Sequence, residues 1–301
     1  MKGVLFLYMG APDSPEAIQP FLYNLFSDDA IISMPMNKLM AFVISRLRAR
    51  KVKRRYELIG GASPLLKITS EQAEALEKRL GVPVYVGMRY WKPFINEALD
   101  RVLKAGIDKL VVLPLYPQYS STTTGSAFSE LSLAQRNRKQ KLVITKIKSW
   151  QRNELFIEAL AEKTEAALNN FEAEIIFSAH SLPVSIIEKG DPYQKQVKET
   201  VEALESRLGV KGTIAYQSSG PGRWLKPEIK EVITSMASEG KKKVLVAPVS
   251  FVSDHIETLY DIDIAMKKYA GKLGIELRRT EALNTSESFI RALEKIVRDS
   301  L

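Results

Sequence analysis

The chain has 301 residues, of which 45% are hydrophobic and 26% charged, and it contains no cysteine. A chain of this length is expected to form two domains of about 150 residues each. The absence of cysteine excludes disulfide bonds, thiolate zinc sites, cysteine-bound iron–sulfur clusters and a cysteine nucleophile. The net charge of +9 favours an anionic partner, such as a nucleic acid, an anionic lipid or a carboxylated small molecule. A lysine-rich surface without any partner would give the same charge.

No secretory signal or membrane-spanning segment is visible in the sequence. Met1 and Lys2 lead directly into a strand-like run, without the longer apolar core and small-residue cleavage site of a signal peptide. No apolar stretch reaches the roughly 18 residues that a membrane-spanning helix needs. We therefore expect the protein to be cytoplasmic.

The first part of the chain combines a short strand, a helix and an unusual insert. Residues 4–9 form an apolar run that ends in a turn, and a helix is expected from Pro15 to Phe26. Residues 31–44 are apolar but have neither a clean period nor the length of a strand, and a cluster of Arg and Lys follows within 46–55. This apolar lip with its basic collar suggests contact with a membrane surface or with an acidic, apolar ligand. A buried helix followed by a solvated basic helix is the alternative.

Beyond this insert, the sequence alternates regularly between predicted strands and helices. Its first half is expected to contain strands at 82–88, 109–115 and 141–147 and helices at 70–80, 94–105 and 126–138. A helix at 153–171 then begins a second series, with strands at 174–179, 213–217, 244–249 and 276–279 and helices at 193–208, 227–238, 257–270 and 287–297. Repeated strand–helix units predict parallel sheets with helices on both faces.

The two halves also resemble each other in sequence. Residues 106–115 match 240–249 without a gap, and residues 4–9 match 175–180 in the same way, so that Met9 is the counterpart of His180. Chance similarity between valine-rich strands is the alternative, but the matched glycines and prolines favour a repeat. The sequence therefore predicts an α/β fold of two similar Rossmann-like domains, each a parallel four-stranded sheet flanked by helices.

We expect the first domain to span residues 1–148, with the lip insert at about 21–55. The second domain would span 149–301, with its last helix packing back on the first domain. Two similar domains that face each other would leave a cleft between their loops, where ligands commonly bind.

His180 is one of only two histidines in the chain. It ends the apolar run 175–180 and precedes a loop that contains Pro183, which is the pattern of a buried parallel strand. In open α/β sheets, ligands bind at the carboxyl ends of the strands, where this imidazole would lie. A hydrogen-bonded core histidine is the alternative.

The other histidine, His255, lies in the segment 253–260, which follows a predicted strand and so belongs to the same sheet edge. Imidazole and carboxylate groups together can bind a divalent transition metal, and a histidine can accept a proton near neutral pH. Alternatively, Asp254 caps the following helix and Glu257 completes a capping box.

Two further loops carry polar or aromatic side chains. The hydroxyl-rich segment 116–126, which contains Tyr119, can bind an anionic group at a helix N-terminus or can cap itself. The segment 217–224 has an isolated Gly-x-Gly without the third glycine of a dinucleotide fingerprint, and the sequence has no P-loop, so a nucleotide enzyme is disfavoured. Trp224 offers a stacking surface for a flat ligand, although a partly buried tryptophan is the commoner outcome.

Taken together, these segments resemble the ferrochelatase family, which inserts ferrous iron into a porphyrin. The resemblance covers essentially the whole chain in family order, through the segments 21–28, 59–64, 88–91, 116–126, 177–183, 190–193 and 250–263. Three departures concern one wall of the site: Ala62 replaces a usual glycine, Tyr216 a usual tryptophan, and the loop 217–224 is one residue short.

The resemblance implies that porphyrin binds in the cleft between the two domains. It implies that His180 and Glu257 form the catalytic and iron-binding pair on one face of the macrocycle. Further residues are expected to contact or serve the substrates: Met9, Arg46, Tyr56, Ser63, Tyr119, Trp224 and Asp254. Asp254 would pass protons or iron along together with Glu257.

The family divides over its porphyrin substrate. Met9 and the long apolar lip are similar to the protoporphyrin-type members, which dock on membranes, whereas coproporphyrin-type members tend to have tyrosine at this position and a shorter lip. We therefore expect insertion of ferrous iron into protoporphyrin IX to give protoheme with release of two protons. Coproporphyrin III is the alternative substrate.

The expected partners are porphyrin and ferrous iron, with a peripheral membrane contact through residues 31–44 and no nucleic acid. No cofactor beyond the iron substrate, and no iron–sulfur cluster, is expected. Two other classes of protein remain open: a non-enzymatic carrier of tetrapyrrole or metal, and a nucleic-acid- or membrane-binding protein that uses residues 46–55.

Overall fold

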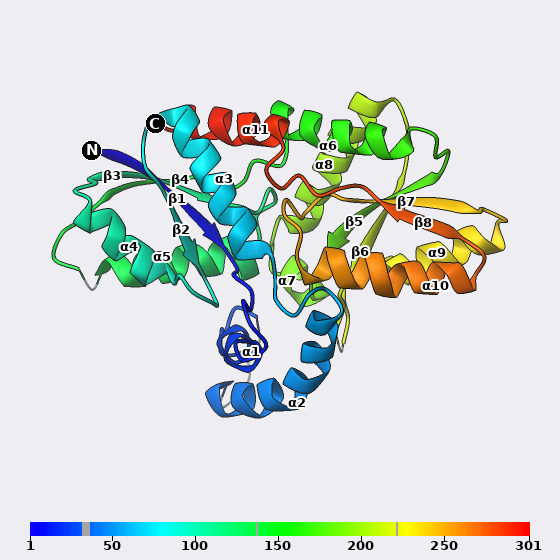
Figure 1. Cartoon of the computed structure of the whole chain (residues 1–301), viewed down its shortest axis with the longest axis horizontal. Helices are drawn as coiled ribbons and strands as arrows, with labels where there is room; N and C mark the ends of the chain where they lie inside the picture. Colours follow the sequence, from blue (N-terminus) through cyan, green and yellow to red (C-terminus); the bar gives the residue numbers. More distant parts are fainter. Residues whose placement is uncertain (32–36, 137, 221) are drawn as a thin grey trace. The chain divides into compact units, whose positions relative to one another are not determined.

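Figure 1 shows a computed structural model of the chain, which describes residues 1–31, 37–136, 138–220 and 222–301. Part of the predicted lip, residues 32–36, therefore lies outside the described residues. The chain divides into two compact units, of which the first comprises Met1–Ser149 with Leu293–Leu301 and the second Trp150–Ala292.

The first unit contains a parallel sheet with the strand order β2-β1-β3-β4. Its strands are β1 (Lys2–Tyr8), β2 (Val84–Met88), β3 (Lys109–Pro114) and β4 (Val143–Lys146). Its helical elements are α1 (Ile18–Phe26), α2 (Asn37–Glu57), α3 (Leu65–Leu80), α4 (Ile95–Lys104), the π-helix η1 (Ser121–Gly125) and α5 (Ser126–Arg136). Residues 4–7 of β1 are fully buried, which explains why this strand is a continuous apolar run rather than an alternating one.

The second unit repeats this architecture, with a parallel sheet in the order β6-β5-β7-β8. Its strands are β5 (Glu174–His180), β6 (Thr213–Gln217), β7 (Lys243–Pro248) and β8 (Glu276–Arg279). Its helices are α6 (Glu154–Leu168), α7 (Val184–Glu188), α8 (Tyr193–Leu208), α9 (Ile229–Ser238), the π-helix η2 (Glu257–Met266), α10 (Lys267–Lys272) and α11 (Glu287–Arg298), whose last residues belong to the first unit. The predicted fold class, two parallel four-stranded α/β sheets flanked by helices, is confirmed.

The register of the two sheets is the same. Leu5 of β1 pairs with Val112 of β3, and Ile176 of β5 pairs with Val246 of β7 in the equivalent position. The match extends beyond the segments recognised in the sequence, because residues 92–115 and 226–249 align without a gap. In both units the backbone N–H of the N-cap residue donates a hydrogen bond to the glutamate side chain at the third position of the helix. The distance is 2.7 Å in α4 and 2.9 Å in α9.

In each unit a π-helix is the next element after the third strand: η1 follows β3, and η2 follows β7. η1 has five residues and η2 has ten. The helix predicted at 257–270 is therefore a π-helix that continues into α10. Helices of this kind are rare and occur often at functional sites.

The insert differs most from the prediction. Residues 37–57 form one continuous helix, α2, whose buried residues are Ala41, Ser45 and Tyr56. α2 packs against α1 and leaves several large apolar side chains exposed: Leu39, Met40, Phe42, Val43 and Leu47. The alternative of a buried helix is therefore wrong for the described part of the lip.

Candidate functional site

The His180 side chain lies at the end of β5, as predicted, and is partly exposed. Its Nδ1 contacts the backbone carbonyl of Ser181, which can only accept a hydrogen bond, so Nδ1 carries the proton. In the neutral ring, Nε2 then has a free lone pair. Nε2 lies 3.6 Å from Oε1 of Glu257. The structure thus brings together two residues from separate segments of the sequence, one at the end of β5 and the other at the start of η2.

Two hydroxyl groups fix the backbone at His180. The His180 N–H donates to Oγ of Ser250, which follows β7, at 3.2 Å, and its carbonyl accepts from the Tyr193 hydroxyl at 3.0 Å. Burial, above all, raises the pKa of Tyr193, so its hydroxyl stays protonated and remains a donor. The backbone that carries the imidazole is therefore held on both sides of the His180 Cα.

Glu257 is the first residue of η2, and its side chain is only 14% exposed. Its backbone carbonyl accepts from the Gln217 amide at 3.1 Å, and its Oε2 lies 3.5 Å from the Ser218 hydroxyl. Ser218 follows β6 with a left-handed φ of 65°. The ends of β5, β6 and β7 all contribute to this site, which therefore lies at the carboxyl edge of the second sheet.

His255 is a core residue and not part of the pair. Its side chain is buried, its Nδ1 donates to the Ser253 carbonyl at 3.0 Å, and its ring packs edge-on against Phe251. Burial lowers the pKa of His255, which keeps the ring neutral. The capping box proposed for Glu257 is also wrong, because the N-cap residue of η2 is Ile256, which has no side-chain hydrogen bond.

Asp254 is held by several partners at the start of η2. Its Oδ1 accepts from the Thr258 hydroxyl at 2.9 Å and lies 3.1 Å from Nη2 of Arg279. Its Oδ2 accepts from the Asn284 amide at 2.9 Å. Both carboxylate oxygens are therefore engaged within the protein.

The remaining predicted binding residue of the second unit, Trp224, is partly buried and packs over Gly220, where an added Cβ would lie 2.8 Å from the indole ring. This close approach requires glycine. The neighbouring Pro221 of the predicted loop 217–224 lies outside the described residues.

In the first unit, Met9 follows β1 and is partly buried, whereas Tyr56 near the end of α2 is 3% exposed. Ser63 accepts a hydrogen bond from the Leu65 N–H at 3.3 Å, at the start of α3. Tyr119 is partly buried in the loop before η1. Arg46 is exposed on α2, with its guanidinium over the Phe42 ring. The roles predicted for these residues, and for His180 and Glu257, stay predictions.

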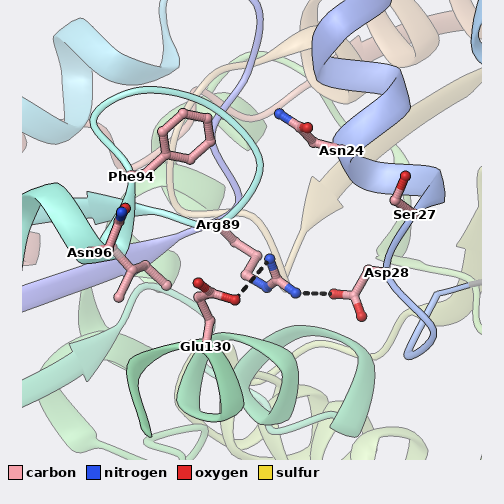
Figure 2. Close-up of a pocket in the computed structure, with 8 residues that line it drawn as sticks. Asn24, Ser27, Asp28, Arg89, Phe94, Asn96 and Glu130 are labelled. Atoms are coloured by element: carbon pink, nitrogen blue, oxygen red, sulfur yellow. Dashed lines mark ion pairs between the residues drawn. The ribbon is translucent and has the colours of Figure 1, made fainter. Parts of the chain in front are cut away.

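The first unit also has a polar pocket of about 340 Å³ (Figure 2). Its lining residues are Asn24, Ser27, Asp28, Arg89, Phe94, Ile95, Asn96 and Glu130. Figure 2 shows the Arg89 guanidinium between Asp28, at 3.0 Å, and Glu130, at 3.5 Å. Burial acts to raise the pKa of Asp28, but hydrogen bonds from Ser126, Tyr90 and the backbone of Ala30, with the charge of Arg89, outweigh it, so the pKa lies below its usual value.

Sequence reasoning missed several supporting residues. Ser181 and Gln217 lie inside segments that were singled out for other side chains. Arg279 was only the end of a predicted strand. Its signal would have been a basic side chain at the carboxyl end of a strand, combined with the acidic side chains of the preceding segment 257–263.

The described residues 1–31, 37–136, 138–220 and 222–301 contain no group of three or more His, Asp or Glu side chains that could hold a metal ion. Nε2 of His180 and the Glu257 carboxylate are of the ligand types that divalent transition metals accept. Within the same residues, no helix has the length and apolar character needed to cross a membrane.

The fold is that of the chelatases. SirB from Bacillus subtilis, solved with Fe³⁺, superposes with a TM-score of 0.63 at 12% identity, covering 100% of this chain and 95% of that one. CbiX, described as the terminal enzyme of siroheme biosynthesis in denitrifying bacteria, gives a TM-score of 0.55 at 13% identity, covering 99% of each chain. At these identities the similarity shows the fold alone.

Sequence similarity is far closer to another group of chelatases. The Ferrochelatase family model matches residues 1–301. The ferrochelatase of Aquifex aeolicus is 47% identical, covering 100% of this chain and 99% of the relative, and that of Desulfotalea psychrophila is 46% identical, covering 99% and 97%. The chain therefore belongs to the ferrochelatase family of metal-chelating lyases and acts in heme biosynthesis on porphyrin and iron.

Proposed function

We propose that this enzyme inserts ferrous iron into protoporphyrin IX and gives protoheme. The porphyrin ring loses its two pyrrole N–H protons and gains Fe²⁺, so the net charge of the porphyrin is unchanged and two protons leave. The observation that supports a site for this chemistry is the 3.6 Å contact between Nε2 of His180 and Oε1 of Glu257 at the carboxyl edge of the second sheet.

In this proposal His180 is the proton acceptor. The Ser181 carbonyl holds the proton on Nδ1, so Nε2 is the basic nitrogen and accepts a pyrrole proton. The resulting imidazolium donates from Nδ1 to Ser181 and from Nε2 towards Glu257. The Glu257 carboxylate stabilises this positive charge, which lowers the cost of the proton transfer.

Glu257 has a second part in the proposal. A carboxylate oxygen beside an imidazole nitrogen is a ligand set that suits a divalent transition metal. Iron is a substrate here, so the two protein ligands release it as the four porphyrin nitrogens take it up, and Nε2 of His180 is then free to accept a pyrrole proton. No resident cofactor is needed beyond this iron. Retention of full activity by chelator-treated protein, once ferrous iron is supplied, tests that part.

The proposal is tested by anaerobic incubation with ferrous iron and porphyrin, followed by the absorbance of the metalloporphyrin. The native enzyme is expected to insert iron, and His180→Ala is expected to bind porphyrin with little turnover. Normal turnover by a folded His180→Ala variant would overturn the assignment. A non-enzymatic carrier would bind porphyrin and leave it metal-free, and a nucleic-acid-binding protein would leave the porphyrin spectrum unchanged.

The choice of protoporphyrin over coproporphyrin rests on Met9 and on the exposed apolar side chains in the first half of α2. We propose that Met9, Tyr56, Ser63, Tyr119 and Trp224 contact the macrocycle, and that Arg46 pairs with its carboxylates.

Competition between the two porphyrins measures the substrate preference as a ratio of kcat/KM. Met9→Tyr is expected to shift this ratio towards coproporphyrin by about tenfold or more, since a single apolar contact with a substrate is worth about 1–3 kcal/mol. An unchanged ratio would remove Met9 from the substrate contacts.

We further propose that the enzyme is cytoplasmic and contacts a membrane surface peripherally through α2. The exposed side chains of Phe42, Val43 and Leu47, followed by basic residues, are the combination that binds an anionic interface. Sedimentation with anionic vesicles tests this, with neutral vesicles as the control. Phe42→Ser with Leu47→Ser is expected to reduce the bound fraction, and equal binding would argue against the contact.

A further inference from the structure

We infer that Arg279 is a positioning residue for iron insertion: it joins Asp254 to Asp263 across the start of η2 and thereby fixes the place of the Glu257 carboxylate. The inference rests on the proposed function of Glu257. It concerns side chains that bind neither iron nor porphyrin themselves.

The contacts of Arg279 span the part of η2 that contains Glu257. At the end of β8, its guanidinium makes a two-pronged contact with Asp263, with Nε–Oδ1 at 2.9 Å and Nη2–Oδ2 at 2.8 Å. The same Nη2 lies 3.1 Å from Oδ1 of Asp254. Asp254 precedes Glu257 and Asp263 follows it, so one guanidinium ties both flanks of Glu257 to the sheet. Two-pronged arginine–carboxylate pairs are geometrically specific.

Asn284 fixes the same point from another side. Its Oδ1 accepts from the Asp254 backbone N–H and its Nδ2 donates to Oδ2 of Asp254, both at 2.9 Å. Its own N–H donates to the Val252 carbonyl at 2.9 Å. The fully buried Thr258 hydroxyl completes the network, because it contacts Asp254 and accepts from the His255 N–H. Asp254 and Thr258, which lie on either side of Glu257 in the chain, are therefore held by side-chain hydrogen bonds.

Burial makes Arg279 costly to lose. Its side chain is 9% exposed and faces two carboxylates, Asp254 at 19% and Asp263 at 37% exposure. Removal of the guanidinium would leave both carboxylates without their cation, and partly buried unpaired charges drive local rearrangement. The start of η2 would move towards solvent, and the Glu257 carboxylate would move with it.

The first unit offers an internal comparison. Lys146 pairs in β4 with Val112, in the position that Arg279 occupies opposite Val246. The Lys146 ammonium lies over the Phe128 ring and contacts the Ser132 hydroxyl at 3.1 Å. The arginine that bridges two aspartates is therefore found beside η2, which begins with Glu257. In the first unit, where η1 begins with Ser121, the equivalent position is Lys146.

Asp254 receives a different role from the one expected from the sequence. With both oxygens engaged by Arg279, Thr258 and Asn284, Asp254 acts as an anchor for η2. Direct passage of protons or iron would require an oxygen that is free to exchange partners.

The test compares Arg279→Lys and Arg279→Gln with the matched control Arg278→Gln, which removes a half-exposed arginine from the same strand. For Arg279→Lys, kcat for iron insertion is expected to fall about tenfold or more, because loss of an outer-shell partner typically costs 10–100-fold. The KM for porphyrin is expected to stay within about twofold, because Arg279 does not contact it. Arg278→Gln should change neither.

Amide hydrogen exchange of residues 255–262 provides a readout that does not need turnover. Faster exchange in Arg279→Lys, with an unfolding temperature close to that of the native protein, supports the inference. An unchanged kcat, or a raised porphyrin KM with unchanged kcat, would overturn it. Additive losses in Asp254→Asn combined with Arg279→Gln would also contradict it, because members of one network are expected to be non-additive.

These experiments distinguish a failure of the proposed function from a failure of the inference about Arg279. If the native protein inserts no iron into either porphyrin, that function is wrong, whereas the exchange comparison still reports whether Arg279 anchors η2. Unchanged exchange at 255–262 in both Arg279 variants would reject the anchor whatever the reaction.

Discussion

The two units share one architecture, yet in the part of the chain that the structure describes only the second unit has an imidazole and a carboxylate at the end of its central strands. β1 and β5 occupy the same place in their sheets and have the same register. β1 is followed by Met9, however, whereas β5 ends at His180. After the third strand, the first unit has a serine- and threonine-rich π-helix, and the second has η2 with Glu257 at its start.

The shared fold therefore fixes where the side chains lie at the sheet edge, whereas the identity of each side chain determines which reactions the site can perform. A thioether cannot accept a proton at neutral pH, and hydroxyl groups do not replace a carboxylate as a neutral-pH base. In the first unit the polar groups form instead the Arg89–Asp28 network around a pocket. Side chains exchanged between equivalent positions of the two units should therefore transfer or remove activity.

The largest effect is expected from His180→Met, which gives the second unit the side chain of the first. Removal of the proton acceptor should lower kcat for iron insertion by about 10²–10⁴-fold, because the thioether of methionine cannot accept the pyrrole proton. Porphyrin binding, followed by fluorescence quenching, should remain. Activity within tenfold of the native enzyme would show that the imidazole is not the acceptor.

A smaller loss is expected from Glu257→Gln. The amide keeps the shape of the side chain but removes its charge, so the imidazolium form of His180 loses its stabilising partner. We expect kcat to fall by about 10–100-fold, with the iron dependence of the rate shifted to higher concentration. Steady-state rates over a range of ferrous iron concentrations measure both. Glu281→Gln, at an exposed ion pair of the same unit, is the control and should behave as the native enzyme.

In the first unit, Asp28→Asn should change stability more than chemistry. The folded pKa of Asp28 lies below its usual value, so the carboxylate contributes stability above its unfolded pKa near 3.8 and loses that contribution as pH falls through the folded pKa. We expect about 1–3 kcal/mol of destabilisation at pH 7.

Denaturant unfolding of the native and Asp28→Asn proteins between pH 3 and 7 measures this difference. The gap should close as the pH falls below about 4. A gap that is constant with pH would mean that the Asp28 charge does not stabilise the unit.

The smallest effect is expected from the reverse exchange. Met9→His, placed in the His180→Met background, should restore no iron insertion, because the π-helix of the first unit carries no carboxylate at its start. The same anaerobic assay measures it. Recovery of about a tenth of native kcat would mean that the imidazole suffices without a carboxylate beside it.

The regular elements were largely predictable because their signals are local. α8 has the predicted bounds, Tyr193–Leu208, since Pro192 precedes it and Gly209 ends it with a left-handed φ of 68°. α2 was missed because its apolar residues do not form one buried stripe. They remain exposed, and a helix of that kind has no clear period in the sequence.

The site was predictable only in part. His180 and Glu257 were selected by their place after predicted strands and by the family resemblance, whereas the sequence left His255 open as a second metal-binding imidazole. Its exclusion comes from burial and from the Ser253 carbonyl that holds its Nδ1 proton. The resemblance gave no reason to single out Arg279.

The alternation of strands and helices, the similarity of the two halves and the place of one imidazole at a strand end could be predicted from the sequence, because they depend on residues close together in the chain. The contact of His180 with Glu257, the binding of both Asp254 oxygens and the link from η2 to β8 through Arg279 came from the three-dimensional structure. Such contacts join residues far apart in the chain, and they form because packing places the ends of neighbouring strands at one sheet edge.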